Sequence, residues 1–335
     1  MKQMTSAAAL VDGLRHAMQS DERVIVVSSH LLGLGPHRTL MDPLHEEFHD
    51  RFFEPPNSEA ALAGLGAAAA MVGDRPLINF STANFTYLAW SQIANDAATA
   101  HHMTNGAIRV PVVYYAMHGV RGGGAAQHNS SPQAMLWNCP GLEIVLPSSP
   151  ADAKGLLVSA LKSDNPTFFL THAKLLGTEG PVPEGPYELP LGRAEVKRAG
   201  RDVTIVATSY MVVVALAAAE ALAKEGIEAD VIDPRSLVPL DEEAILASVA
   251  RTGRVVVVDE CHLRCSTASE LTAMIAEKGF QFLKSAPVRV ARADVPTAFS
   301  APLEAAITPD RDKVIAAVKY VIAGVPHPAG RPSLG

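Results

Sequence analysis

The sequence predicts an α/β protein of two doubly wound domains, in which helices cover both faces of mainly parallel sheets. Strand-like apolar runs alternate with helical runs along the chain, and this order is typical of parallel sheets. A segment rich in Pro and Gly, residues 174–191, interrupts the alternation and is expected to be a linker. The length of 335 residues and the hydrophobic content of 48% suit two domains with large cores. We expect domains at 1–173 and 192–325, and a disordered tail at 326–335.

The first domain is expected to consist of helices that are each followed by a strand. The helices are expected at 6–19, 58–72, 86–104 and 150–162, and the strands at 23–28, 76–81, 110–116 and 166–171. Gly64 and Gly66 fit a relaxed dinucleotide-binding pattern, but they lie inside a helix rather than at a strand-to-helix turn. We therefore expect these glycines to allow close helix packing.

The second domain repeats the alternation beyond the linker. Its strands are expected at 202–207, 227–232 and 253–259, and its helices at 210–224, 241–250 and 267–278. The apolar runs are of strand size, and charged residues break the Ala-rich helices before the ~20 residues that a bilayer crossing needs. The sequence therefore predicts no membrane span.

Charge and cysteine content argue against several function classes. A formal net charge of −7 argues against a general nucleic-acid binder. The apolar stretch at 7–11 ends at Asp12 and is too short for a signal peptide, so the cytoplasm is the expected location. Cys139, Cys261 and Cys265 form neither a disulfide framework nor a zinc pattern, and are expected to be small buried thiols.

Two segments carry candidate chemistry. His128 ends a nearly side-chain-free stretch that includes three consecutive glycines at 122–124, and such a loop can bring a proton donor to a substrate. A flexible surface connection is the alternative reading of that stretch. Glu59 opens the Ala- and Gly-rich helix after Asn57 and Ser58, where helix capping is the alternative to a catalytic role.

The order of these motifs resembles the β-subunit family of 2-oxoacid dehydrogenase E1 components. The resemblance covers roughly residues 5–322, and its motifs lie at 57–60, 127–130, 139–142, 150–155, 202–206, 231–242 and 255–260. Transketolases share the architecture, but their corresponding loop usually has Asp-Gly and Thr-His, which are absent here. The resemblance implies a thiamine diphosphate pyrimidine-binding domain followed by a transketolase C-terminal-like domain.

The resemblance also implies roles for individual residues. Glu59 matches the glutamate that activates the cofactor by sharing a proton with the aminopyrimidine N1′, and Phe85 matches the aromatic residue that packs against this ring. His128 matches the histidine on the substrate side, which in the family stabilises reaction intermediates and assists acyl transfer to a lipoyl group. Asn57 replaces an apolar residue and Ser81 a larger one beside the cofactor, so we expect an altered, more polar pocket.

Part of the expected cofactor site is missing from the chain. The chain lacks the Gly-Asp-Gly and distant Asn with which thiamine enzymes hold Mg²⁺ and the diphosphate. The resemblance therefore implies that an alpha subunit in an α2β2 heterotetramer supplies this half. It also implies a K⁺ bound by backbone carbonyls, and the matching positions are Val112, Ala160, Leu161, Ser163 and Asn165, with Ser163 in place of an aspartate.

A further departure from the family concerns the first strand. Ser28, Ser29 and His30 stand where the family has Gly-Glu-Asp, whose acid is proposed to link the two active sites of the tetramer. Taken alone, His30 and His118 are each read as surface residues.

The implied reaction is oxidative decarboxylation of a 2-oxo acid, with transfer of the acyl group to a lipoyl group on an E2 protein or to another acyl carrier. Two alternatives remain open. One is transketolase-like transfer of two carbons from a ketose phosphate to a carrier thiol. The other is a non-catalytic partner that stabilises an alpha subunit.

Overall fold

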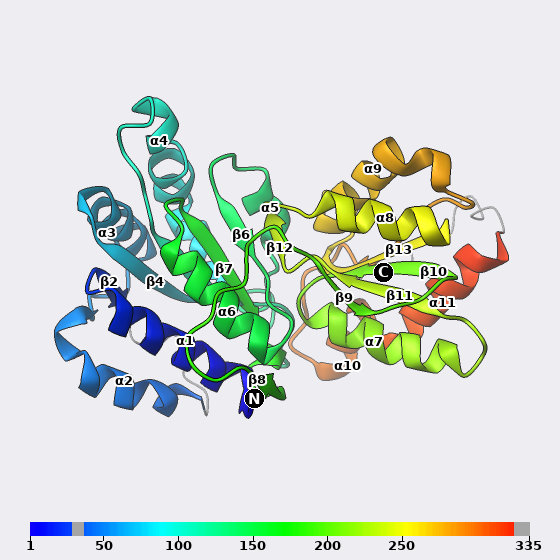
Figure 1. The fold of residues 1–335 in the computed structure, drawn as a ribbon, viewed down its shortest axis with the longest axis horizontal. Coiled ribbons are helices and arrows are strands. Elements are labelled where there is room, and N and C mark those ends of the chain that lie inside the picture. Colours follow the sequence, from blue (N-terminus) through cyan, green and yellow to red (C-terminus); the bar gives the residue numbers. More distant parts are fainter. Residues whose placement is uncertain (29–36, 325–335) are drawn as a thin grey trace. The chain divides into compact units, whose positions relative to one another are not determined.

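The computed structural model describes residues 1–28 and 37–324, which divide into two compact units (Figure 1). The first unit contains Met1–His118, Met135–Leu191 and Leu237–Pro239, and the second contains Gly119–Ala134, Gly192–Ser236 and the chain from Leu240 on. Residues 119–134, which the sequence predicts to lie in the first domain, group with the second unit in the structure. The domain boundaries stay a prediction, and the tail at 326–335 lies outside the described residues.

A seven-stranded sheet with the order β12-β6-β7-β5-β4-β2-β3 forms the centre of the first unit. From β3 to β6, each neighbouring pair is parallel. The carboxyl ends of these strands therefore share one edge, which is where open α/β sheets bind ligands. The strands are β2 (Val24–Val27), β3 (Phe52–Phe53), β4 (Arg75–Thr82), β5 (Val113–His118), β6 (Glu143–Val145), β7 (Thr167–His172) and β12 (Ser236–Val238).

Helices cover both faces of this sheet. Helices α1 (Ser6–Ser20) and α6 (Pro150–Lys162) pack against each other and form one core with the sheet. Helix α3 (Glu59–Val72), with the short helices η3 (Ala83–Ala89) and η4 (Gln92–Ala97), forms the other core. Because both faces are covered, β5 is buried along its whole length.

The expected helix at 86–104 is interrupted. A 3₁₀ helix (η3), a π-helix (η4) and the short α4 (Ala100–Met103) replace it. Thr86 Oγ1 donates a hydrogen bond to the Ala83 carbonyl at 2.6 Å, and Thr104 Oγ1 donates to the Ala100 carbonyl at 2.8 Å. Such side-chain bonds compete with the backbone ladder of a regular helix.

The segment at 174–191, expected to be irregular, contains β8 (Glu179–Val182), which pairs antiparallel with β1 (Lys2–Thr5). The rest of the segment packs along α6, where Tyr187 Oη donates to the Ala151 carbonyl at 2.7 Å. The remaining elements of this part of the chain are η1 (Arg38–Met41), α2 (Asp42–Glu47), η2 (His49–Arg51), α5 (Gln133–Trp137) and η5 (Ala173–Leu175).

Two glycines of the first unit allow close approaches. A Cβ added to Gly66 would lie 2.4 Å from a side-chain carbon of Ile78 on β4, so the packing role expected for this glycine is confirmed. Gly141 has φ +102°, and a Cβ there would lie 2.1 Å from the carbonyl oxygen of Ala98. The backbones around residues 98 and 141 touch only because Gly141 has no side chain.

The second unit contains a five-stranded sheet with the order β14-β13-β10-β11-β9, in which only β9 runs antiparallel to its neighbour. The strands are β9 (Glu195–Arg198), β10 (Val203–Ala207), β11 (Ala229–Asp233), β13 (Val255–His262) and β14 (Val288–Arg292). Helices α7 (Tyr210–Ala223) and α11 (Arg311–Ala323) share a core with this sheet. Helices α8 (Glu242–Thr252) and α9 (Thr267–Gly279) also pack on it, and η6 (Phe280–Phe282) and α10 (Ala301–Ile307) complete the unit.

The expected α/β class is confirmed in both units. Strands β9 and β14 and helices α10 and α11 were not expected from the sequence. Across residues 1–28 and 37–324, no helix has the length and apolar character required to cross a membrane.

Candidate active site

Glu59 is the first residue of α3 and is half-buried. Its helix follows the carboxyl end of β3 through a short connection, so the carboxylate stands on the ligand-binding side of the sheet. The side chain of Ser58, the N-cap, forms no capping hydrogen bond, and among the described residues no hydrogen bond or ion pair engages the Glu59 carboxylate. This carboxylate is therefore available to a ligand.

Phe85 lies on η3, which follows the carboxyl end of β4 and packs against α3. The first unit thus brings the elements of Glu59 and Phe85 into contact. Phe85 is half-buried, whereas Asn57, in the turn before α3, is exposed. A partly exposed aromatic ring on one of these elements and a carboxylate on the other suit a flat heterocycle that carries a proton-accepting nitrogen.

The backbone is strained where β4 and β2 end. Ser81 has φ +61° and Ser28 has φ +69°, a region that non-glycine residues rarely adopt. Asn79 holds this arrangement, since its Oδ1 accepts a hydrogen bond from the Ser81 amide at 2.7 Å and its Nδ2 lies 3.5 Å from the Ser28 carbonyl. Strain of this kind concentrates at ligand sites. Ser29 and His30 lie outside the described residues.

His128 lies in the second unit, on a loop of residues 119–132 that leads into α5, and is half-buried. The amide of Gly119 donates to the carbonyl of Ser130 at 2.9 Å and closes the base of the loop. The His128 amide donates to the Gly124 carbonyl at 3.1 Å, and Ala125 has φ +47°. The loop therefore has a defined local path despite its glycines.

Two histidines end neighbouring strands of the first unit. His118 on β5 is paired in register with His172 on β7, and their ring centroids lie 5.1 Å apart in an edge-to-face arrangement. Both are buried. The surface position expected for His118 is therefore wrong, because β5 and β7 are buried along their lengths and their parallel register places His118 beside a second imidazole.

A set of buried polar residues around the His128 loop is not among the candidate residues expected from the sequence. Asn129, Glu260, Arg292 and Glu304 are each at most 5% exposed and contact the loop or one another. Their positions in the chain are far apart. Asn129 and Glu260 lie in the motifs at 127–130 and 255–260, but no local pattern signals Arg292 or Glu304.

The three cysteines differ in environment. Cys139 and Cys261 are buried, and burial raises the pKa of both thiols. Cys265 is exposed, so the expectation that it is a buried thiol is wrong. Within the described ranges, no group of three or more His, Cys, Asp or Glu residues is arranged to hold a metal ion.

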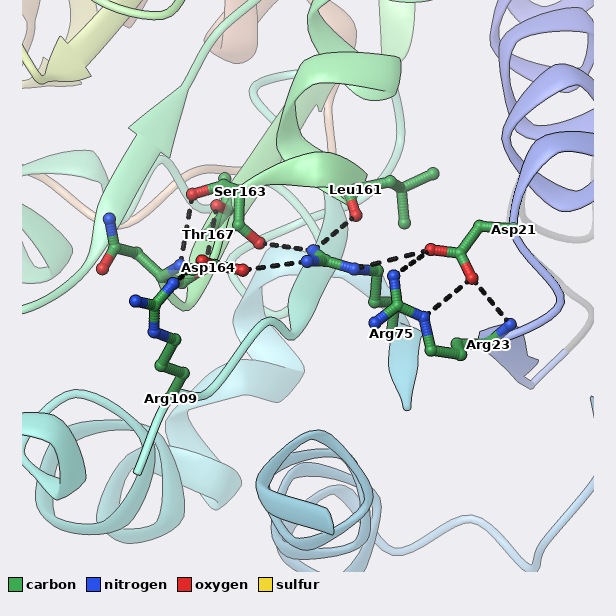
Figure 2. A network of polar contacts seen from close by, with 9 residues as sticks. Asp21, Arg23, Arg75, Arg109, Leu161, Ser163, Asp164 and Thr167 are labelled. Carbon is green, nitrogen blue, oxygen red and sulfur yellow. Dashed lines mark hydrogen bonds and ion pairs between the residues drawn. The ribbon is translucent and has the colours of Figure 1, made fainter. Parts of the chain in front are cut away.

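Arg75 occupies the region where the sequence resemblance implies K⁺ (Figure 2). Its Nη1 donates to the carbonyls of Leu161 and Ser163, at 3.1 and 2.8 Å. The carbonyls of Val112 and Asn165 accept from Thr167, at 2.8 and 3.3 Å, and that of Ala160 accepts from the Ser163 amide at 3.2 Å. Each carbonyl has a second lone pair, but a fixed positive charge already lies between two of them.

Carboxylates flank this guanidinium. Asp164 is partly buried, which opposes ionisation, but hydrogen bonds from Arg75 and Arg109 hold the pKa of its carboxyl below the usual range. Arg23 donates to Asp21 and lowers the pKa of that carboxyl, and Arg75 contributes a weaker effect. Figure 2 shows that Arg75 joins the two carboxylates and the end of α6.

Comparison with known proteins places this chain in a family. The family model described as "Transketolase, pyrimidine binding domain" matches residues 2–178, and "Transketolase, C-terminal domain" matches residues 192–314. The beta subunit of an acetoin:2,6-dichlorophenolindophenol oxidoreductase from Bacillus subtilis is 37% identical over 92% of this chain and 94% of its own length. The pyruvate dehydrogenase E1 subunit beta-1 of Arabidopsis thaliana is 36% identical, over 95% of this chain and 89% of its own. The chain belongs to the 2-oxoacid dehydrogenase E1 beta-subunit family.

Two solved structures have a fold similar to that of this chain. A structure titled "Split gene transketolase, inactive beta4 tetramer" has a TM-score of 0.77 and 26% identity, and the match covers 96% of this chain and 99% of that one. A transketolase variant from Pichia stipitis has a TM-score of 0.69 and 15% identity, over 96% of this chain but only 46% of its own. The second match concerns the fold alone. The expected order of a pyrimidine-binding and a C-terminal domain is confirmed.

Proposed function

We propose that this chain is the beta subunit of a thiamine diphosphate-dependent 2-oxoacid dehydrogenase E1. With an alpha subunit it decarboxylates a 2-oxo acid oxidatively and passes the acyl group to a lipoyl group of an E2 protein or to another acyl carrier. The availability of the Glu59 carboxylate at the first turn of α3 is the observation that carries this proposal. Membership of the E1 beta-subunit family supports it.

Three side chains carry the proposed chemistry. Bound thiamine diphosphate would supply the carbon nucleophile that attacks the oxo group. Glu59 would hold a proton at N1′ of the aminopyrimidine ring, and Phe85 would pack on that ring and orient it. His128 would exchange a proton with the substrate. Asn57, before α3, and Ser81, near the end of β4, would add polar surface to the proposed pocket.

We propose an alpha subunit as the partner in an α2β2 heterotetramer, where it would hold Mg²⁺ and the diphosphate. Helix α3 supports this, because Ala61, Leu65, Ala68 and Val72 form an exposed apolar row on the helix that Glu59 begins. A helix that is apolar on all sides is normally covered. The similar split-gene beta subunit is titled an inactive tetramer, and by analogy we expect this chain alone to be inactive. The cytoplasm is the proposed location.

We further propose a K⁺ at the carbonyls of Val112, Ala160, Leu161, Ser163 and Asn165, bound in competition with Arg75. Replacing choline by K⁺ is expected to raise the melting temperature of Arg75→Met more than that of the unsubstituted chain. A ligand at about ten times its Kd adds about 1.4 kcal/mol, or a few degrees. The increase in melting temperature from choline to K⁺ is measured for each protein separately. A lower melting temperature of Arg75→Met in choline therefore does not affect the comparison. Equal K⁺ increments in the two proteins would show that Arg75 does not compete for this site.

The proposed reaction is tested by purifying the chain with its candidate alpha subunit and measuring reduction of 2,6-dichlorophenolindophenol. We expect thiamine diphosphate-dependent reduction with a 2-oxo acid such as pyruvate, and none by either subunit alone. A dye acceptor removes the need for an E2 protein. If the complex instead forms products only from a ketose phosphate and a thiol, the transketolase-like alternative replaces this proposal.

The non-catalytic alternative predicts a different pattern. In that case the alpha subunit would provide the whole site, and substitutions at Glu59 and His128 would leave the activity of the complex unchanged. The absence of Gly-Asp-Gly from this chain would then not indicate that the two subunits share one cofactor site.

A further inference from the structure

Asn129 is a buried residue directly after His128, and both polar atoms of its side-chain amide are hydrogen-bonded. It is 1% exposed. Its Oδ1 accepts a hydrogen bond from the Arg121 amide at 3.2 Å, and its Nδ2 donates to Oε1 of Glu304 at 2.9 Å. The side chain therefore ties the residue after His128 to the start of the glycine-rich stretch and to helix α10.

Arg292 holds the backbone of the same residue. Its Nη1 donates to the Asn129 carbonyl at 2.7 Å and to Thr297 Oγ1 at 3.3 Å. The guanidinium is only 2% exposed and stays charged, and among the described residues its Nε has no hydrogen-bond partner. The shorter of these two hydrogen bonds is therefore the one to the Asn129 carbonyl, directly after His128. A hydrogen bond from a charged donor is stronger than one from a neutral donor.

The glycine-rich stretch is shaped to accept Asn129. A Cβ on Gly124 would lie 2.3 Å from Asn129 Oδ1, so only glycine lets the amide approach this backbone. The Gly124 carbonyl in turn accepts the His128 amide hydrogen bond. At the start of the loop, the Val120 amide donates to the carboxylate of Glu260. The path of the loop on both sides of His128 therefore depends on buried polar contacts.

The charges around Asn129 make these contacts directional. A buried guanidinium faces its carbonyl oxygen and a buried carboxylate faces its amide nitrogen, so each charge lies opposite the complementary end of the residue. Without these hydrogen bonds, a loop with three consecutive glycines would gain much backbone conformational entropy by leaving this conformation. Bonds to charged groups contribute more than neutral ones and offset this tendency.

We propose that Asn129, held between Arg292 and Glu304, is a positioning residue that sets the place of the His128 imidazole. The inference rests on the proposed role of His128 in the reaction. Asn129 itself does not touch the reacting atoms in this proposal, and it acts through the backbone it shares with His128. A histidine displaced by about 1 Å is expected to lose on the order of 10²-fold in rate.

The test uses the alpha-beta complex with Asn129→Ala and Arg292→Met. Each substitution is expected to lower kcat by about 10- to 100-fold, while the Kd for thiamine diphosphate changes less than threefold. Arg292→Lys, which keeps one donor and the charge, is expected to recover part of the loss. Ser248→Ala is the matched control, since Ser248 is fully buried in a polar network of the same unit with Thr204 and Asp230.

A double-mutant cycle separates positioning from general destabilisation. In a His128→Gln background, Asn129→Ala is expected to lower kcat by less than twofold, because the side chain it positions is already gone. If Asn129→Ala has the same effect in both backgrounds, or if Ser248→Ala lowers kcat equally, the positioning role is refuted. If His128→Gln itself leaves kcat unchanged, the proposed function fails first, and that result is visible without any Asn129 variant.

Limited proteolysis of the chain alone gives a readout that needs no activity. Trypsin is expected to cut after Arg121 at least tenfold faster in Asn129→Ala and Arg292→Met than in the unsubstituted protein, with cutting elsewhere unchanged. Ser248→Ala is expected to leave the Arg121 site protected. Equal cleavage rates after Arg121 in all four proteins would refute the proposed restraint of the loop, whatever reaction the complex performs.

Discussion

Glu59→Gln is expected to lower kcat of the alpha-beta complex by about 10²- to 10⁴-fold, the range typical of removing a positioned proton-transfer group. Gln has nearly the shape of Glu, but its amide cannot share a proton with a ring nitrogen in the way that a carboxyl does. Helix α3 is expected to form normally, because no described hydrogen bond or ion pair of the Glu59 side chain is lost. The measurement is steady-state dye reduction at saturating substrate and cofactor, with the melting temperature recorded for each protein.

Glu46→Gln is the matched control for this prediction. Glu46 is an exposed helical glutamate of the same unit, and it lies on α2 rather than α3. The control is expected to retain full kcat. If both substitutions leave kcat unchanged, Glu59 has no catalytic role, and the chain is better described as a non-catalytic partner of the alpha subunit.

Gly141→Ala is expected to lower the free energy of unfolding by roughly 3–5 kcal/mol, from steric overlap and positive-φ strain together. The new Cβ would meet the Ala98 carbonyl oxygen 2.1 Å away, and a backbone atom cannot rotate aside as a side chain can. Thermal or urea unfolding measures the loss, which corresponds to a melting temperature lower by roughly 10 °C.

Gly185→Ala separates the two contributions. Gly185 also has positive φ, +72°, but a Cβ there would have no neighbour within 4 Å. This control is expected to lose only about 1 kcal/mol from backbone strain. Equal losses in the two variants would mean that the close approach of residues 98 and 141 does not stabilise the protein.

Elements with a strong local pattern could be predicted from the sequence. The strand expected at 253–259 contains the apolar run Val255–Val258 of β13, and the helix expected at 150–162 is α6, which Ser149 caps by accepting a hydrogen bond from the Asp152 amide. These signals depend on neighbours in the chain. Strand β14 was missed, because Arg289 and Arg292 make its five residues read as a charged segment.

Contacts between distant residues could not be predicted. Arg292 is buried because the carbonyl of Asn129, 163 positions away, accepts its hydrogen bond. His118 is buried because the parallel register of β5 and β7 brings it to His172. The oxygens of Leu161 and Ser163 that accept hydrogen bonds from Arg75 belong to the backbone, so no residue type reveals them. The family resemblance named Glu59, Phe85 and His128, and their roles stay predictions.

Thiamine diphosphate binding, measured by calorimetry, tests the shared site most directly. The titration is made with this chain alone, with the alpha subunit alone and with their complex, each in the presence of Mg²⁺. We predict binding only by the complex, and weaker binding when the complex carries Glu59→Gln. Tight binding by the alpha subunit alone, or a complex that does not bind the cofactor, would contradict a site built from both subunits.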